Sequence, residues 1–316
     1  MRIKLFGFLA ILGLISTFVG AEDVPPPKNP DIQHILTVPA GGLVDFLKRP
    51  NNPIPMVSYH RGGPAPGFPE NSLEAMKNAL SYGYGLMEID VAQLRDGTLI
   101  LMHDDTLSRT TTGEGAVRQQ TWDDVKDLYL KDNDGKVTNY RIPRLRDVLL
   151  WAKGRTIVTL DFKRGVNFAK VAAMVEETGA QDYTAGISYT LDQAVTYNRL
   201  APNMPLSIGM SSDEDIAAFD ASGISSDIVL AWTGTRLRDP AFYKKLHARG
   251  WRVLVGTLGW RPTSIDNQIK AGTSNVSYRD IMAMGADVIA TDRFWAVQKE
   301  ISSPNLFVFS LQRLAK

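Results

Sequence analysis

Residues 86–105 read LMEIDVAQLRDGTLILMHDD, and the way their strands pair decides the fold class. Two short apolar runs, Leu86–Val91 and Thr98–Met102, are typical of buried strands. The Asp96-Gly97 pair between these runs is typical of a hairpin turn, which would make the two strands antiparallel. The alternative is that residues 92–97 return as extended chain and that both strands are parallel.

Outward from this stretch, short apolar runs alternate with amphipathic helices from Met56 onward, an order typical of α/β folds with a parallel sheet. One helix is expected to begin after Asn71, with Glu74 as its capping-box partner. Another is expected over Trp122–Leu130, capped by Thr121. The further candidate strands are Met56–Tyr59, Thr156–Leu160, Thr184–Ser188, Pro205–Ile208, Asp227–Leu230, Arg252–Val255 and Asp287–Ala290.

These runs give nine candidate strands, one more than a closed (β/α)₈ barrel needs. A hairpin at Asp96-Gly97 would remove one strand from the barrel, and so would a later run that stays outside it. An open doubly wound sheet is the second choice, but it normally carries a Gly-rich phosphate loop after its first strand. Here Pro64 and Pro66 follow Gly62-Gly63 and would obstruct a helix at that point. The sequence therefore favours a single-domain TIM-type barrel.

The N-terminal residues are typical of a secretory signal. Arg2 and Lys4 precede an apolar run, Leu5–Val19, and small residues lead to a cleavage site after Ala21. A retained membrane anchor is the alternative, but the run is shorter than the roughly 20 apolar residues that span a bilayer. No other segment is long and apolar enough. We expect a secreted or periplasmic protein with a signal peptide (1–21), a Pro-rich leader (22–55) containing a short helix near Leu43–Leu47, a barrel domain (56–300) and a C-terminal tail (301–316).

Composition excludes several classes of protein. The chain has no cysteine, so it has neither disulfides nor zinc–thiolate sites. It has 35 basic and 34 acidic side chains, and two of the basic ones fall in the signal. The remaining near-neutral balance provides no general attraction for nucleic acid or anionic membranes. An anionic substrate must therefore be bound by local groups.

Polar side chains repeatedly occur at the ends of the apolar runs. In a TIM-type barrel these ends meet at one mouth, where active sites of this fold lie. The clusters are His60-Arg61, Glu88 with Asp90, His103-Asp104, Asp161 with Lys163, and Thr291-Asp292.

Three carboxylates in these clusters are candidate metal ligands. The two-residue spacing of Glu88 and Asp90 puts both on one face of a strand, where they repel each other unless a cation lies between them. Asp161 can add a third oxygen ligand. An all-oxygen site suits Mg²⁺ or Ca²⁺. The alternative is that the acids are exposed or paired with Arg61 and Lys163.

Two of the four histidines are candidate acid–base residues. His60 and His103 each follow a strand, and an imidazole titrates near neutrality, so one can accept a proton while the other donates one. His34, in the leader, and His247, in a helix, are better interpreted as surface or packing residues. A phosphodiester also needs positive charge on its phosphoryl oxygens, which a metal with nearby basic side chains would provide.

Together these motifs resemble the glycerophosphodiester phosphodiesterase family over roughly Met56 to Asp292. The ordered set is specific, although each piece alone is weak. The matching pieces are His60-Arg61-Gly62, Pro69-Glu70-Asn71-Ser72, Glu88-Ile89-Asp90-Val91, Asp96-Gly97, His103-Asp104, Thr106-Leu107-Ser108-Arg109-Thr110-Thr111, Ile142-Pro143-x-Leu145, Asp161-x-Lys163 and Gly285-Ala286-Asp287-Val288-Ile289-Ala290-Thr291-Asp292.

The resemblance implies a TIM-type barrel that hydrolyses small-molecule glycerophosphodiesters to glycerol 3-phosphate and an alcohol with one divalent cation. It implies a cyclic phosphate, formed by attack of a glycerol hydroxyl and then opened by water. By position, the implied roles are a catalytic pair, His60 and His103; phosphate-binding cations, Arg61 and Lys163; a supporting acid, Glu70; and metal ligands, Glu88, Asp90 and Asp161.

The chain departs from the family pattern at two places. Asp161 stands where Glu is common and is one methylene shorter. Near the seventh strand the family often has Trp-Thr-x-Asn, whereas here residues 256–259 read Gly-Thr-Leu-Gly. Trp260 is a candidate replacement for the aromatic wall, and a wider pocket is the alternative.

Three other functions remain open at this stage. A phospholipase C- or D-type member acting on intact lipid or lysolipid would need an exposed apolar rim, for which Phe68, Trp232 and Trp260 are candidates. A non-catalytic binding protein on a decayed barrel would be expected to have lost part of the acid and imidazole set. An unrelated metal-dependent barrel, such as a sugar isomerase, is disfavoured by the tandem His motifs.

Overall fold

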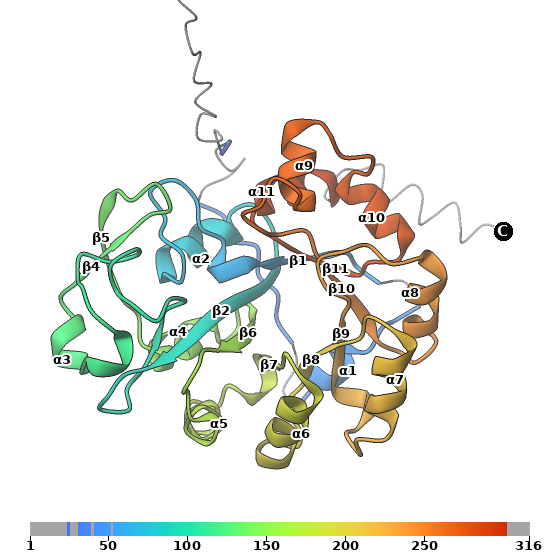
Figure 1. The fold of residues 1–316 in the computed structure, drawn as a ribbon, viewed down its shortest axis with the longest axis horizontal. Coiled ribbons are helices and arrows are strands. Elements are labelled where there is room, and N and C mark those ends of the chain that lie inside the picture. Colours follow the sequence, from blue (N-terminus) through green and yellow to red (C-terminus); the bar gives the residue numbers. More distant parts are fainter. Residues whose placement is uncertain (1–23, 26–30, 39–40, 52, 302–316) are drawn as a thin grey trace, which may run out of the picture.

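The computed structural model describes residues 24–25, 31–38, 41–51 and 53–301, and in them eight parallel strands close a barrel (Figure 1). The first barrel strand pairs with both the second and the last, so the sheet has no open edge there. The TIM-type barrel is confirmed and the open doubly wound sheet is excluded. In barrel order the strands are β1 (Met56–Tyr59), β2 (Gly85–Gln93), β6 (Ile157–Phe162), β7 (Thr184–Ile187), β8 (Leu206–Gly209), β9 (Val229–Trp232), β10 (Arg252–Gly256) and β11 (Val288–Thr291).

The ninth candidate strand is the second arm of a hairpin. β3 (Leu99–Leu101) is antiparallel to β2, with Val91 opposite Leu101. At the turn, Gly97 has a φ of 88°, which favours glycine, and the Thr98 amide donates to the Asp96 carboxylate. The hairpin prediction is therefore confirmed, and β3 lies outside the barrel.

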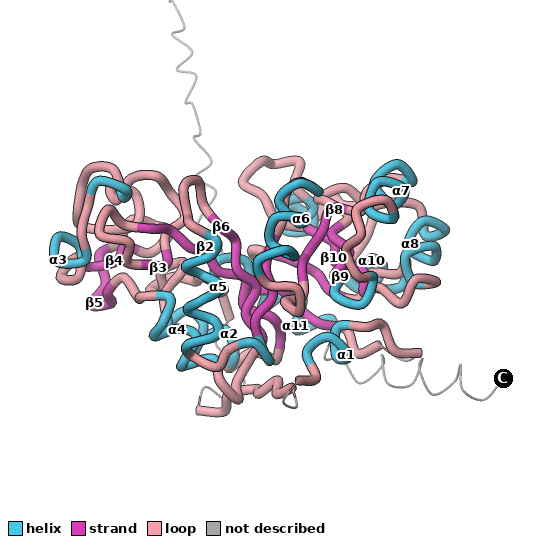
Figure 2. The backbone as a smooth tube through the Cα atoms, turned by 90° about the horizontal axis from the view of Figure 1, so that it is seen from below, coloured by secondary structure: helices cyan, strands magenta, loops and turns pink. Residues whose placement is uncertain are grey.

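Helices cover the outside of the barrel (Figure 2). Their apolar faces, such as Val148 and Leu149 in α4, belong to the same core as the outward side chains of the strands. The helices are α1 (Leu43–Leu47), α2 (Leu73–Leu80), α3 (Trp122–Val125), α4 (Leu145–Ala152), α5 (Phe168–Glu177), α6 (Leu191–Leu200), α7 (Asp213–Asp220), α8 (Pro240–His247), α9 (Ile265–Ala271), α10 (Tyr278–Met284) and α11 (Phe294–Ile301).

Side chains inside the barrel alternate with side chains that face the helices. The inward residues form a separate cluster that includes Met56, Leu86 and Ile157 together with Leu43 and Leu47 of α1. Because side chains repeat every second residue along a strand, the inward positions continue to the polar residues at the carboxyl ends. The fold therefore presents those residues at one mouth.

The predicted helix over Trp122–Leu130 is wrong beyond its first turn. α3 ends at Val125, and residues 129–131 instead form β4 (Tyr129–Lys131), which pairs with β5 (Val137–Arg141). The apolar spacing looked helical, but pairing with distant segments satisfies the backbone: Leu130 also bridges Thr111, and the Lys131 amide donates to the Thr110 carbonyl. Both views show α3, β4 and β5 at one flank of the barrel.

The leader contains the predicted short helix, and this helix packs against the barrel. The Arg49 guanidinium lies 3.0 Å from Asp287, and Arg252 donates to the Phe46 carbonyl. The predicted signal peptide (1–21) and the residues from Ser302 of the predicted tail lie outside the described residues. Across the described ranges, no helix combines the length and apolarity needed to cross a bilayer.

Candidate active site

Three buried carboxylates meet at the mouth of the barrel. Glu88 and Asp90 lie on β2, and Asp161 lies on β6 directly beside Asp90 in the strand register. One ligand oxygen from each lies within 4.8 Å of the other two. The sequence prediction that these residues come together is thus matched by the geometry.

The electrostatics of this cluster fit a bound cation. Burial raises the pKa of Glu88 to about 8, and the adjacent Asp90 carboxylate adds to the rise. Oδ1 of Asp161 is buried without a hydrogen-bond partner among the described residues. Buried acceptors are rarely left unpaired, and three carboxylates suit a hard divalent cation.

Lys163 neutralises part of the cluster. Its Nζ lies 2.6 Å from an oxygen of Asp90 and 2.6 Å from one of Asp161. Burial alone would raise the pKa of Asp90, but Lys163 and His103 outweigh burial and lower it. The alternative that basic side chains pair with the acids is therefore partly right. Arg61 contributes less, because its Nε is 3.9 Å from Asp90.

Two residues with strained backbones, both in the segment after β1, form hydrogen bonds to the acids. Arg61 and Asn71 have φ values of 52° and 58°, a region that residues other than glycine rarely occupy. The Arg61 amide donates to Glu88 over 2.7 Å. Asn71 donates to an oxygen of Asp90 over 2.6 Å and accepts from the Asp90 amide over 2.9 Å. The strain is held by contacts to two candidate ligands.

Asn71 was expected to cap a helix, and that expectation is wrong. The cap of α2 is Ser72, whose hydroxyl accepts from the Ala75 amide. Both residue types are good caps, so the sequence alone could not separate neighbours that differ in backbone conformation. Asn71 precedes the cap, and its side chain supports the site through its hydrogen bonds to Asp90.

His60 follows β1 and is oriented by an acid from the neighbouring strand. Its Nδ1 lies 2.6 Å from Asp292, which also accepts from the Gly259 amide. Burial lowers the pKa of His60, but Asp292 and Glu88 outweigh it and raise the value to about 9. With Nδ1 engaged, Nε2 is the nitrogen that can meet a substrate.

His103 follows β3 and is held by a second network. Its Nδ1 lies 2.7 Å from Asp104, whose pKa is held far below its usual range chiefly by Arg109. Arg109 also makes two hydrogen bonds to Glu70, and Glu70 in turn pairs with Arg61 at 3.0 Å. Glu70 therefore connects the surroundings of both imidazoles.

Tyr189 was not singled out as a site residue in the sequence. It comes two residues after the end of β7, and its hydroxyl donates to Asp161 over 2.6 Å although the residue is 67% exposed. Its place directly after the expected strand was the available signal. Asp292, Asp104 and Arg109 carried a clearer signal, because they stand in the motifs or at the strand ends.

The remaining histidines lie elsewhere. His247 contacts Asp287 over 3.0 Å, and the same carboxylate pairs with Arg49 of the leader. His34 is exposed. Both placements agree with a packing or surface role.

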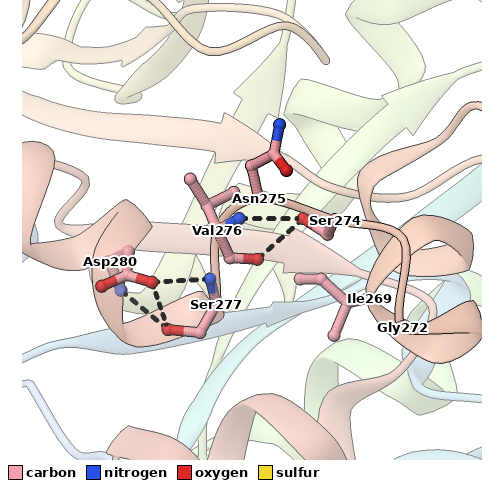
Figure 3. Close-up of a pocket in the computed structure, with 7 residues that line it drawn as sticks. All are labelled: Ile269, Gly272, Ser274, Asn275, Val276, Ser277 and Asp280. Carbon is pink, nitrogen blue, oxygen red and sulfur yellow. Dashed lines mark hydrogen bonds between the residues drawn. The ribbon is translucent and has the colours of Figure 1, made fainter.

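A pocket between α9 and α10 contains none of the candidate site residues (Figure 3). Ser277 and Asp280 in its wall satisfy each other as the capping box of α10. These contacts satisfy the Ser277 and Asp280 side chains without a ligand.

Comparisons with known proteins identify a family and similar chains. A profile of the family described as "Glycerophosphoryl diester phosphodiesterase family" matches residues 60–294. The uncharacterized protein YqiK of Bacillus subtilis is 30% identical over 176 residues, covering 52% of this chain and 72% of that protein. A glycerophosphodiester phosphodiesterase of Caldanaerobacter subterraneus is 36% identical over 113 residues, 35% of this chain and 46% of that one.

Solved structures share the barrel. A glycerophosphoryl diester phosphodiesterase of Parabacteroides distasonis aligns with a TM-score of 0.75 and 31% identity, covering 85% of this chain and 93% of that chain. A phosphodiesterase of Oleispira antarctica, solved with sn-glycerol-3-phosphate, aligns with a TM-score of 0.59 and 21% identity, covering 79% and 98%. The second likeness concerns the fold alone.

Proposed function

The chain belongs to the glycerophosphoryl diester phosphodiesterase family, and from this premise we propose that it hydrolyses glycerophosphodiesters to glycerol 3-phosphate and an alcohol with the help of a divalent cation. It is a phosphoric diester hydrolase by family. The observation that carries the proposal is the meeting of three buried carboxylates with two imidazoles, each oriented through Nδ1 by an acid.

Glu88, Asp90 and Asp161 would hold the cation, which we propose to be Mg²⁺ or Ca²⁺ because all three ligands are oxygens. When bound, the cation would stabilise negative charge on the phosphoryl oxygens. Lys163 and Arg61 would bind the phosphate as well. Arg61 remains in position because Glu70 holds its guanidinium.

The two histidines would move the protons. In the first step a glycerol hydroxyl attacks phosphorus, one imidazole takes the hydroxyl proton, and the bond from phosphorus to the alcohol oxygen breaks. The other imidazole gives its proton to that oxygen. In the second step water opens the cyclic phosphate and the imidazoles exchange roles. Asp292 and Asp104 support this exchange because each holds its imidazole in one tautomer.

One observation favours a second candidate function, action on lysolipids or intact lipids. Trp260 is 85% exposed in the segment that follows β10, and the Arg261 guanidinium lies 5.4 Å from its ring. An exposed indole beside a cation suits a lipid–water interface. Phe68 is less available, since it stacks on Tyr140.

We also propose that the protein is exported and that the signal is cleaved after Ala21. The support is the sequence of residues 1–21, with its basic start and apolar run. Export would bring the enzyme into contact with glycerophosphodiesters outside the cytoplasm. Mass determination of the mature protein after expression in a secreting host tests this directly.

The function is tested by following the phosphorus-containing products of glycerophosphocholine, glycerophosphoinositol and lysolipids by ³¹P NMR, with and without EDTA. Glycerol 3-phosphate should accumulate, EDTA should stop its formation, and added Mg²⁺ or Ca²⁺ should restore it. His60→Ala should be inactive, and His34→Ala, a histidine outside the site, is the matched control.

Three results would count against the proposal. Turnover that is insensitive to EDTA would show that the reaction needs no cation. Full activity of His60→Ala would show that His60 is not an acid–base residue. Preference for a lysolipid over every soluble diester would favour the second candidate.

A further inference from the structure

The side of the mouth away from the acids has an aromatic inner wall. Paired residues of parallel strands point to the same face of the sheet. Asp161 faces the barrel interior, and the register pairs it in turn with Ile187, Ser207 and Leu230, so these residues face the interior as well. Two residues further along β9, Trp232 also faces inward.

Gly209 is the inward residue beside Trp232, and the space above it is open. The register pairs Gly209 with Trp232, and Gly209 is exposed although it ends a barrel strand. Among the described residues, no heavy atom beyond its chain neighbours lies within 4 Å of the position that a Cβ would take. The barrel thus leaves room at this point.

Aromatic rings on both sides lean away from Gly209. A Cβ on Gly256 of β10 would collide with the six-membered ring of Trp232, so this ring lies over β10. On the other side, Tyr189 reaches toward β6 and bonds Asp161. The absence of a side chain at Gly256 is what lets the indole take this position.

Among the inward residues at this level, Tyr189 and Trp232 present aromatic rings and Gly209 presents no side chain. The inward hydroxyl on β8 is that of Ser207, which is 3% exposed and lies one inward position deeper than Gly209. A polyol placed here would leave hydroxyls unpaired, which is costly in a confined site. A quaternary ammonium group needs no hydrogen bonds and is attracted to the faces of tryptophan and tyrosine.

We propose that the open space at Gly209, between Tyr189 and Trp232, is the subsite for the alcohol part of the substrate and that it selects alcohols with a quaternary ammonium group, such as choline. This inference rests on the proposed function of the same site. Tyr189 borders the subsite on one side and touches a candidate metal ligand, so the alcohol would lie next to the reacting phosphorus.

The test compares kcat/KM for glycerophosphocholine and glycerophosphoglycerol in four proteins: the wild type, Trp232→Leu, Gly209→Val and Trp151→Leu. The wild type should prefer glycerophosphocholine. Trp232→Leu should lower kcat/KM for that substrate by about tenfold, which lies between the values for an exposed and a desolvated cation–π contact. It should change kcat/KM for the other substrate much less. Trp151→Leu, in α4 away from the mouth, controls for the loss of a partly buried tryptophan.

Gly209→Val fills the open space and keeps Trp232. It should lower kcat/KM for glycerophosphocholine. Choline chloride should inhibit the wild type and should not inhibit Gly209→Val. Thermal unfolding of each variant checks that it folds. If Trp232→Leu does not fold, the result for Gly209→Val alone tests the subsite.

Equal losses on both substrates in Trp232→Leu and Gly209→Val, or unchanged inhibition by choline, would overturn the subsite. A wild type that prefers glycerophosphoglycerol would overturn the selectivity. A wild type that cleaves no glycerophosphodiester at all would instead refute the proposed function, so the two failures are distinguishable.

Discussion

Asn71 shows how a single residue can combine backbone strain with support of the site. Its positive φ is unfavourable for any residue but glycine, and its side chain makes two hydrogen bonds to Asp90. The strain persists because these bonds, together with one from its amide to the Arg61 carbonyl, fix it in place.

Replacing Asn71 by alanine should therefore keep the strain and lose the bonds. We expect Asn71→Ala to lower the free energy of unfolding by about 2 kcal/mol, because a buried carboxylate loses a donor. Asn71→Gly should recover part of this loss by relieving the backbone. Urea unfolding of both variants measures the difference, and equal stability of Asn71→Ala and the wild type would contradict the account.

His60 provides a prediction about pH in the cation-free protein. Its pKa, raised to about 9 chiefly by Asp292 against the effect of burial, lies above the unfolded value near 6.5. The ion pair should thus stabilise the fold fully below pH 6.5, and this contribution should disappear as pH rises through about 9.

NMR titration of the His60 ring in EDTA measures this pKa. Asp292→Asn should lower it, since the strongest group raising it is then lost. A ring that titrates near 6.5 in the wild type would show that the pair does not form.

At the scale of elements, the register of β2 against β6 places the ligands. Asp90 and Asp161 are direct neighbours across the two strands, so removing one carboxylate leaves an incomplete set. Asp161→Asn should weaken Mg²⁺ binding at least tenfold by calorimetry and lower kcat by about a hundredfold or more. Asp192→Asn, at the start of α6, is the matched control. Unchanged Mg²⁺ affinity in Asp161→Asn would show that the cation binds at another site.

The segment between β1 and α2 is linked to the segment after β3 through Glu70. This residue is 3% exposed and pairs with Arg61 and Arg109. Glu70→Gln should lower stability by about 3 kcal/mol, because two guanidinium groups lose a buried charge partner. It should also lower kcat, and calorimetric unfolding with steady-state kinetics measures both. A variant with reduced stability and normal kcat would restrict Glu70 to a structural role.

The sequence predicted those elements whose pattern has one physical interpretation. Short apolar runs with polar ends predicted the barrel strands. Asp96-Gly97 indicated the hairpin, although a parallel return of the chain remained the alternative. It failed over residues 122–141, where apolar spacing fits both a helix and a buried strand and long-range pairing decides. For the same reason, the positions of Tyr189 and Trp232 inside the mouth follow only from the strand register, which depends on neighbouring strands.

At the scale of the whole molecule, closure of the barrel brings together residues from β1 to β11. Binding of the cation should raise the free energy of unfolding, because the three ligands come together only in the folded chain. Saturating Mg²⁺ should raise the free energy of unfolding by about 2.7 kcal/mol at a concentration a hundredfold above Kd. Differential scanning calorimetry with EDTA and with Mg²⁺ measures the shift. Asp161→Asn should show almost none, and an equal shift in that variant would point to another binding site.

The most direct test of the central claim is anomalous diffraction from crystals of the protein grown with Mn²⁺ and glycerol 3-phosphate. The account predicts one Mn²⁺ peak bounded by Glu88, Asp90 and Asp161, with the phosphate of the ligand within hydrogen-bond reach, about 3 Å, of Nε2 in both His60 and His103. An ion bound away from these acids, or a phosphate that only one of the two rings can reach, would contradict it.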